Sequence, residues 1–154
     1  MKKIQISLTI IILSFLFYGN TFAQLINIHR FIGRSQVDLI NELGQPVHFN
    51  DSNPSMMIMS YNLFSLSCIA DQNGIYKVEL TRNYTSEKAA YDDINDFITC
   101  SIRDGFVSDS VSANKYILSS KDIQTEISLA QLKESPYLEL KINALRKTEI
   151  KKYN

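Results

Sequence analysis

Two stretches of the chain place apolar residues at helical spacing, and each is bounded by capping residues. The first runs from Ser35 to Gly44. Ser35 can cap the first turn, and Asp38, three residues later, is placed to complete a capping box with it. Gly44 supplies the residue that ends the helix. Its apolar face consists of Val37, Ile40 and Leu43. We expect a short helix that is stable only when packed against an apolar surface.

The second helical stretch extends over residues 86–104 and is long enough to cover much of a sheet. Gly105 follows it and is typical of a helix end. Its apolar stripe at helical spacing comprises Ala90, Tyr91, Ile94, Phe97, Ile98 and Ile102. An amphipathic helix of this kind packs its stripe on a core and leaves its charged side in solvent.

Six further runs alternate apolar and polar residues with a period of two, which predicts strands with one buried face. They cover residues 57–61, 64–70, 76–81, 116–119, 125–129 and 138–144. Asn73-Gly74 between the second and third runs is typical of a hairpin turn. The predicted class is therefore α+β, an antiparallel sheet with two helices packed on one face. The order helix, three strands, helix, three strands also suggests a tandem repeat of an α-β-β-β unit.

The first 23 residues have the pattern of a secretory signal peptide. Lys2 and Lys3 precede an uncharged run over residues 4–18, and Thr21-Phe22-Ala23 offers a cleavage site. An uncleaved membrane anchor is the alternative, but the run is shorter than the roughly 20 apolar residues that a spanning helix needs. Gln24 stands where a lipoprotein would carry cysteine. We expect a periplasmic or secreted protein with no transmembrane segment after cleavage.

The length and the charge of the chain limit the number of domains and the classes of partner. The chain of 154 residues carries 16 basic and 16 acidic side chains. Removal of Lys2 and Lys3 leaves the chain slightly acidic. A chain with this net charge lacks the excess of basic residues that is typical of nucleic-acid-binding proteins. We expect one domain over residues 24–145 and a solvated basic tail over residues 146–154.

Cys68 and Cys100 are the two cysteines of the chain. Export to an oxidising compartment permits a disulfide between them. Two buried thiols are the alternative, because cysteine also serves as a small apolar core residue. The sequence leaves both open, and the spacing does not match a C-x-x-C redox motif.

The sequence carries no recognisable catalytic or cofactor motif. His29 and His48 have no partner at metal-ligand spacing and are expected to be polar loop residues. Asp109-Ser110-Val111 matches the acceptor triplet for bacterial O-glycosylation, with Ser110 as the modified residue. We expect a non-enzymatic protein without a metal or another cofactor.

The first helical stretch and the hairpin after it resemble a known pattern. The chain is similar to the small outer-membrane lipoprotein A (SmpA/OmlA) domain and to domains of the β-lactamase-inhibitor-protein type over about residues 31–82. The residues that carry the resemblance are Ile32-Gly33-Arg34-Ser35-Gln36-Val37, Leu43-Gly44-Gln45-Pro46, Tyr61, the run 64–70, Asn73-Gly74 and Val78. The resemblance implies a compact exported domain that binds other proteins. The lipid-bearing cysteine is missing, so outer-membrane anchoring is not implied.

These observations together predict an exported accessory protein that acts through contacts with an unknown protein partner. Met57, Tyr61 and Phe64 are the candidate interaction surface, since they combine large apolar side chains on neighbouring strands. Two alternatives stay open: a periplasmic small-ligand carrier or an enzyme without a recognisable motif, and an immunity-type inhibitor of a periplasmic toxin or hydrolase. The sequence identifies neither the partner nor the oligomeric state.

Overall fold

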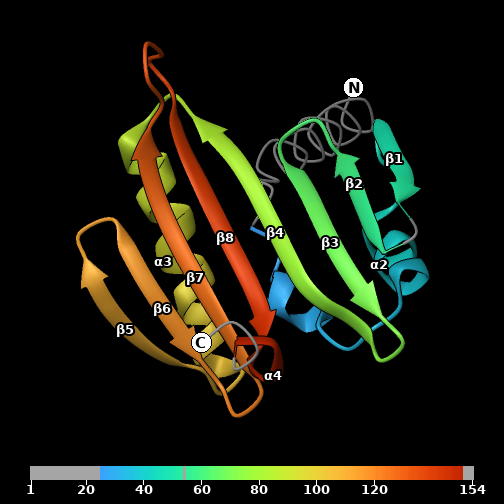
Figure 1. Ribbon diagram of the computed structural model, residues 1–154. Coiled ribbons are helices and arrows are strands. Elements are labelled where there is room, and N and C mark those ends of the chain that lie inside the picture. Colours follow the sequence, from blue (N-terminus) through green and yellow to red (C-terminus); the bar gives the residue numbers. More distant parts are fainter. Residues whose placement is uncertain (1–24, 54, 151–154) are drawn as a thin grey trace, which may run out of the picture.

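The computed structural model describes residues 25–53 and 55–150 (Figure 1). The predicted signal peptide and its cleavage site lie outside the described residues, as do the last four residues of the predicted tail. No helix within the described ranges is long and apolar enough to cross a membrane.

Eight antiparallel strands form one sheet in the order β1-β2-β3-β4-β8-β7-β6-β5. Their bounds are β1 His48–Asn53, β2 Met56–Ser60, β3 Ser65–Asp71, β4 Gly74–Tyr84, β5 Val107–Ser112, β6 Lys115–Ser119, β7 Ile123–Gln131 and β8 Leu138–Arg146. Strands that follow each other in sequence pair as hairpins within each half. The halves join where β4 pairs with β8.

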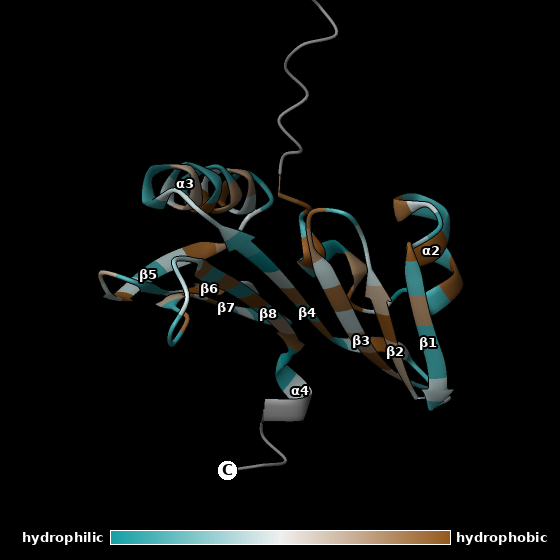
Figure 2. Cartoon of the chain, turned by 90° about the horizontal axis from the view of Figure 1, so that it is seen from above, coloured by the Kyte–Doolittle hydropathy of each residue, from teal (hydrophilic) through white to brown (hydrophobic). Residues whose placement is uncertain are grey.

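The helices complete the fold. Their bounds are η1 Ile28–Phe31, a 3₁₀ turn, α2 Gln36–Leu43, α3 Glu87–Arg103 and the single turn α4 Lys147–Ile150. Figure 2 shows α2 and α3 on the same side of the sheet, α2 over the β1–β3 half and α3 over the β5–β8 half. The α+β class and its antiparallel sheet are confirmed.

Both predicted helices form, and each begins at a serine cap. The Ser35 hydroxyl accepts a hydrogen bond from the Asp38 backbone N–H at 3.1 Å, and the Asp38 carboxylate accepts one from the Ser35 N–H at 3.2 Å. The Ser86 hydroxyl caps α3 by accepting from the Ala89 N–H at 3.3 Å. These bonds satisfy N–H groups that the first turn of a helix leaves without a partner.

The prediction of three strands in each half was wrong, because each half has four. The missed strands are β1 and β5, the outermost strands of the sheet. All six residues of each are exposed. Neither strand buries a face, so neither shows the apolar alternation that reveals a strand in sequence. Pairing with β2 and β6 gives these strands their extended conformation.

One core serves both halves of the sheet. A row of buried apolar residues crosses five adjacent strands as consecutive register partners: Met59, Leu66, Leu80, Ile142 and Ile127. Leu39 of α2 and Ile94 and Phe97 of α3 belong to the same buried cluster. The sheet and its covering helices therefore bury a continuous apolar layer.

The boundary predicted between domain and basic tail needs a correction. Arg146 ends β8, and its guanidinium donates to the carbonyl oxygens of Asn73 and Ile75 at 3.1 and 3.2 Å and lies 3.3 Å from Asp71 Oδ2. Lys147 donates to the Ser120 carbonyl at 2.5 Å. Both residues belong to the folded unit because their charges are held by partners from other strands and loops.

Gly74 lies where the segment before α2 packs closely against the β3–β4 hairpin. Its φ is +91°, and a Cβ there would lie 2.7 Å from the Gly33 carbonyl oxygen and 2.8 Å from that of Arg34. Two backbone hydrogen bonds create this close approach: the Gly33 N–H donates to Ile75 O at 2.7 Å, and the Ile75 N–H donates to Arg34 O at 2.8 Å. Only glycine fits both the dihedral angle and the space.

We therefore expect Gly74→Ala to lower the free energy of unfolding by about 3 kcal/mol or more, since it adds a backbone clash to the cost of a positive φ. Gly105→Ala is the matched control, because Gly105 has φ +89° and nothing within 4 Å of an added Cβ. It should cost about 1–2 kcal/mol. Urea denaturation measures both values. Equal losses would contradict the packing role of Gly74.

Candidate functional site

The structure separates the three residues predicted to form an interaction surface. Met57 lies on the covered face of β2 and is only 3% exposed, so it belongs to the core and to no surface. Tyr61 and Phe64 lie in the connection between β2 and β3 and are partly buried against the core. The candidate surface is therefore this connection, residues 61–64, called the aromatic turn below.

The aromatic turn is held rigidly. The Tyr61 N–H donates to the Phe64 carbonyl at 2.9 Å. The two rings stack with centroids 4.7 Å apart and an interplanar angle of 24°. The Tyr61 hydroxyl donates to the Gly44 carbonyl at 3.1 Å, which ties the turn to the end of α2. Partial burial raises the pKa of Tyr61, so it stays a neutral donor at physiological pH.

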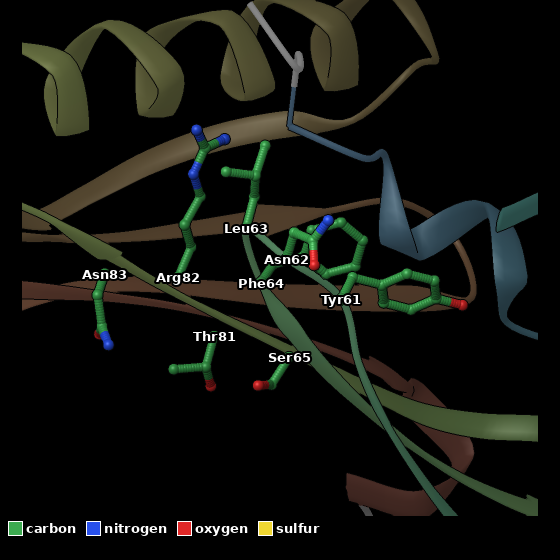
Figure 3. Close-up of a pocket in the computed structure, with 8 residues that line it drawn as sticks. All are labelled: Tyr61, Asn62, Leu63, Phe64, Ser65, Thr81, Arg82 and Asn83. Carbon is green, nitrogen blue, oxygen red and sulfur yellow. The ribbon is translucent and has the colours of Figure 1, made fainter. Parts of the chain in front are cut away.

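Leu63 is the exposed residue of this rigid turn, with 53% of its surface open to solvent. It borders a depression of 340 Å³ lined by residues 61–65 and 81–83. Figure 3 shows Leu63 and Arg82 extending to the side of the sheet that carries α3, whereas Ser65 and Thr81 point to the opposite side. The depression thus lies at the start of β3, where β4 continues past its pairing with β3.

Arg82 forms a fixed wall of the depression. Its guanidinium lies 3.0 Å from Asp93 Oδ2 of α3 and 5.0 Å from the centre of the Tyr84 ring. The Tyr84 hydroxyl donates to the same carboxylate oxygen at 2.6 Å. Burial, with the Asp93 carboxylate next to it, raises the pKa of Tyr84. This cluster joins the end of β4 to α3 and keeps the Arg82 side chain in one position.

The lining of the depression combines apolar and polar side chains. Its described lining residues offer an aromatic pair, one aliphatic side chain, hydroxyl and amide groups and a paired guanidinium. None of them is a histidine, a cysteine or a carboxylate. An exposed aliphatic side chain on a rigid turn is suited to entering an apolar pocket of another molecule. Elsewhere in the described ranges, no group of three or more potential metal ligands occurs.

Ser110, the predicted glycosylation acceptor, lies on the edge strand β5. The residue is exposed, and its hydroxyl lies 3.3 Å from the Ser112 carbonyl oxygen. Modification of this serine stays a prediction.

The two cysteines form no disulfide in this structure. Cys68 lies on the covered face of β3, and burial raises its thiol pKa to about 11. Cys100 is partly exposed on α3. Both cysteines lie on elements of the covered side, β3 and α3, but the two thiols are not joined.

The two histidines have opposite environments. His48 is exposed on β1. His29 lies in η1 and is buried, with its ring 4.0 Å from that of Phe106 and 5.8 Å from that of Phe97. Burial lowers the pKa of His29, although the Asp104 carboxylate 3.5 Å from Nε2 opposes part of this shift. The prediction of a polar loop histidine is wrong for His29, which is a core residue.

Comparison of the chain with protein-family models, with curated sequences and with solved structures finds no match. The geometry of the site is therefore the basis for any functional conclusion.

Sequence reasoning placed Tyr61 and Phe64 on two neighbouring strands and missed Leu63 and Arg82. A signal for Leu63 was present, because residues 62–63 separate the two strand-like runs, and Leu63 is an apolar residue at a position where polar residues are usual. No sequence signal indicates Arg82, since its position depends on Asp93 and on where β3 begins.

The environments of the cysteines predict selective labelling. At pH 8 we expect an aromatic disulfide reagent to modify Cys100 in the folded protein. Cys68 should react only after denaturation, because it is buried and a thiol with a pKa of about 11 is almost entirely protonated at that pH. Absorbance of the released thiolate counts the reactive groups. Cys100→Ser should abolish fast labelling. Fast labelling that persists in Cys100→Ser would contradict the burial of Cys68.

Burial of His29 predicts a loss of stability below neutral pH. Its folded-state pKa is lowered, so the unfolded chain takes up a proton near pH 6.5 before the folded chain does. The free energy of unfolding should fall as the pH decreases from 7.5 to 5.5, by at most about 1.4 kcal/mol per pH unit. Urea denaturation across this range measures the slope. His29→Leu should flatten it, and His48→Gln should leave it unchanged. An equal slope in His29→Leu would contradict this account.

Proposed function

We propose that this chain is an exported, non-enzymatic accessory protein that binds another protein through the aromatic turn. The exposure of Leu63 is the observation that carries the proposal. An aliphatic side chain more than half open to solvent at the tip of a loop loses little entropy on binding when that loop is already rigid. The ring stack and the two hydrogen bonds of Tyr61 provide this rigidity.

The surroundings of Leu63 support the proposal. Productive interface anchors are apolar residues surrounded by polar groups that complete the contact. Here Asn62 is next to Leu63 in the turn, and Arg82 lies on the same side of the sheet as Leu63. Val47, also strongly exposed, is held close to the turn because its N–H donates to the Ser60 carbonyl at 2.8 Å. Export rests on the pattern of the first 23 residues.

We also propose that the two halves of the chain are a structural repeat, each an α-β-β-β-β unit. Both units begin with a serine-capped helix, and both of these helices are followed by a glycine with positive φ, Gly44 and Gly105. Both outer hairpins, β1–β2 and β5–β6, contain an irregularity in register. The sheet order places each unit's last strand at the centre. The resemblance to domains of the β-lactamase-inhibitor-protein type rests on the sequence alone and stays a prediction.

Substitution of Leu63 tests the protein-binding proposal. The tagged chain is produced from its full-length gene in its native host, captured under gentle conditions, and its partners are measured by quantitative mass spectrometry. Leu63→Asp should reduce recovery of a specific partner at least about tenfold, because it places a charge where an apolar contact forms. Thermal unfolding of the purified variants controls for folding.

Val107→Asp is the matched control, since Val107 is 72% exposed on β5 at the opposite edge of the sheet. Recovery with this variant should equal that of the unaltered chain. Equal recovery with Leu63→Asp, or no partner above background with the unaltered chain, would contradict the proposal.

A further inference from the structure

The last residues of β4 have a neighbouring strand on one side only. The register between β3 and β4 stops at Ser65 opposite Thr81, whereas the register between β4 and β8 continues to Tyr84 opposite Leu138. Residues 82–84 therefore pair with β8 but have none of the described strands beside them on the β3 side. We call this side of residues 82–84 the open edge. At about 3.4 Å per residue, its length is about 10 Å.

Hydrogen bonds at the aromatic turn show which backbone groups face the open edge. In an antiparallel ladder, successive residues point their N–H and C=O alternately to the strands on either side. The Tyr61 N–H donates to the Phe64 carbonyl at 2.9 Å, so Phe64 points to the β2 side, and the next residue, Ser65, points to β4. Thr81, opposite Ser65, faces β3 in return. Asn83 is two residues further along β4, so its N–H and C=O point out of the open edge.

A second hydrogen bond leads to the same assignment. The Val47 N–H donates to the Ser60 carbonyl at 2.8 Å, so Ser60 points its backbone groups to the β1 side of β2. Ser60 is the register partner of Ser65. Two residues opposite each other in an antiparallel pair either bond to each other or both point away. Ser65 therefore points away from β2 and to β4.

The depression beside the aromatic turn has the position of a gap in the sheet. Its volume is 340 Å³. Leu63 and Arg82 border it and extend to the side that carries α3, whereas Ser65 and Thr81 border it and point to the opposite side (Figure 3). A hollow on one face would be lined from that face alone. Lining residues from both faces indicate a space in the plane of the sheet, where a strand next to the open edge would lie.

The backbone of the open edge is already held in strand conformation. Its three residues pair with β8. The Arg82 guanidinium and the Tyr84 hydroxyl both contact Asp93 Oδ2 of α3, at 3.0 and 2.6 Å. A strand that pairs with this edge therefore orders little further backbone of the protein, which lowers the entropic cost of binding.

The outer edges of the sheet differ from the open edge. Strands β1 and β5 each carry an irregularity in register, at residues 50–53 and 110–112 respectively. Such irregularities are a common way in which sheets prevent the addition of further strands. The register between β4 and β8 runs without a shift from Lys77 to Tyr84. The open edge is therefore regular, and its backbone is suited to pairing.

We propose that the partner of the aromatic turn contributes an extended segment, which adds to the open edge as a short antiparallel strand. One residue of this segment exchanges two backbone hydrogen bonds with Asn83. The side chain of that residue lies on the uncovered face, and the side chains next to it lie on the side to which Leu63 extends. The segment therefore places an apolar side chain beside Leu63 and a polar one beside Asn83. This inference rests on the proposed function, because it names the kind of partner that binds there.

The test uses the chain produced from its full-length gene and, as the probe, random peptides displayed on phage. Peptides that are enriched relative to an unrelated protein are synthesised, and their affinity is measured by fluorescence anisotropy. We expect the enriched peptides to bind as strands. A methyl group on the one backbone nitrogen that donates to Asn83 should weaken binding at least about tenfold, and a methyl group on the next nitrogen, which points away from β4, should not.

Asn83→Pro tests the same hydrogen bonds from the side of the protein. Proline removes the N–H and is tolerated on a strand edge whose N–H faces no neighbour. This variant should bind the peptides at least about tenfold more weakly. Asn83→Ala is the matched control, because it removes an exposed side chain and keeps the N–H. Its affinity should stay within about twofold of the unaltered chain. The thermal unfolding of the two variants should agree.

Amide hydrogen exchange, followed by NMR, checks the geometry without a substitution. In the free chain the Asn83 N–H should exchange at least about tenfold faster than the Thr81 N–H, which faces Ser65 in the ladder. Addition of an enriched peptide should protect the Asn83 N–H, because a strand then lies beside it.

Four results would each overturn this inference: no enriched peptide, equal peptide affinity of Asn83→Pro, loss of folding in Asn83→Pro, or slow exchange of the Asn83 N–H in the free chain. The last two would assign this N–H to the β8 ladder. The native partner separates the inference from the proposed function. A partner that is lost with Leu63→Asp and retained with Asn83→Pro would support binding through the aromatic turn and contradict strand addition.

Discussion

Pairing of β4 with β8 is the contact on which the rest of the structure depends. Eight register pairs join these strands, from Lys77 opposite Leu145 to Tyr84 opposite Leu138. They are the only strand pair that connects the two halves of the described sheet. The buried row of apolar residues runs across this junction without interruption, so each half completes the core of the other. Arg146 strengthens it by binding the β3–β4 turn from the end of β8.

The depression beside the aromatic turn follows from this junction. Because β4 is longer than β3, its last residues continue along β8 beyond the first residue of β3, and the aromatic turn lies next to the place where β3 begins. The Arg82–Asp93 pair then links this end of β4 to α3.

Elements with a buried face or a capping residue could be predicted from the sequence, and elements without either could not. The serine caps and the apolar stripes located α2 and α3 to within a residue or two. Strands β1 and β5 are exposed along their whole length, so their extended conformation comes from a neighbouring strand and not from their own residues. Alternation correctly put Met57 and Met59 on one face of β2. Whether that face meets solvent or core depends on the helices that cover it, which is why Met57 was misjudged as a surface residue.

His29 shows the same limit for a single side chain. Nothing in its local sequence indicates burial, because the 3₁₀ turn that carries it is too short for a periodic pattern. Phe97 and Phe106, far along the chain, form the apolar environment that encloses it and shifts its pKa. The candidate site was predictable to the extent that it lies in a turn between two clear strands. The position of Arg82 depends on its contact with Asp93 in α3, which no local sequence pattern reveals.

The uncovered face of the sheet is broad, yet the balance of its charges argues against it as the primary binding surface. Its lysines pair with glutamates on the same or a neighbouring strand: Lys77 with Glu79, Lys115 with Glu126 and Lys141 with Glu139. A partner docking there would have to remove water from ion pairs that already satisfy one another, and such pairs return little when they are desolvated. Leu63 is different, because it presents an apolar surface that the described residues leave uncovered. Contact with a partner at Leu63 breaks no ion pair, so the aromatic turn has more to gain from a partner than the uncovered face.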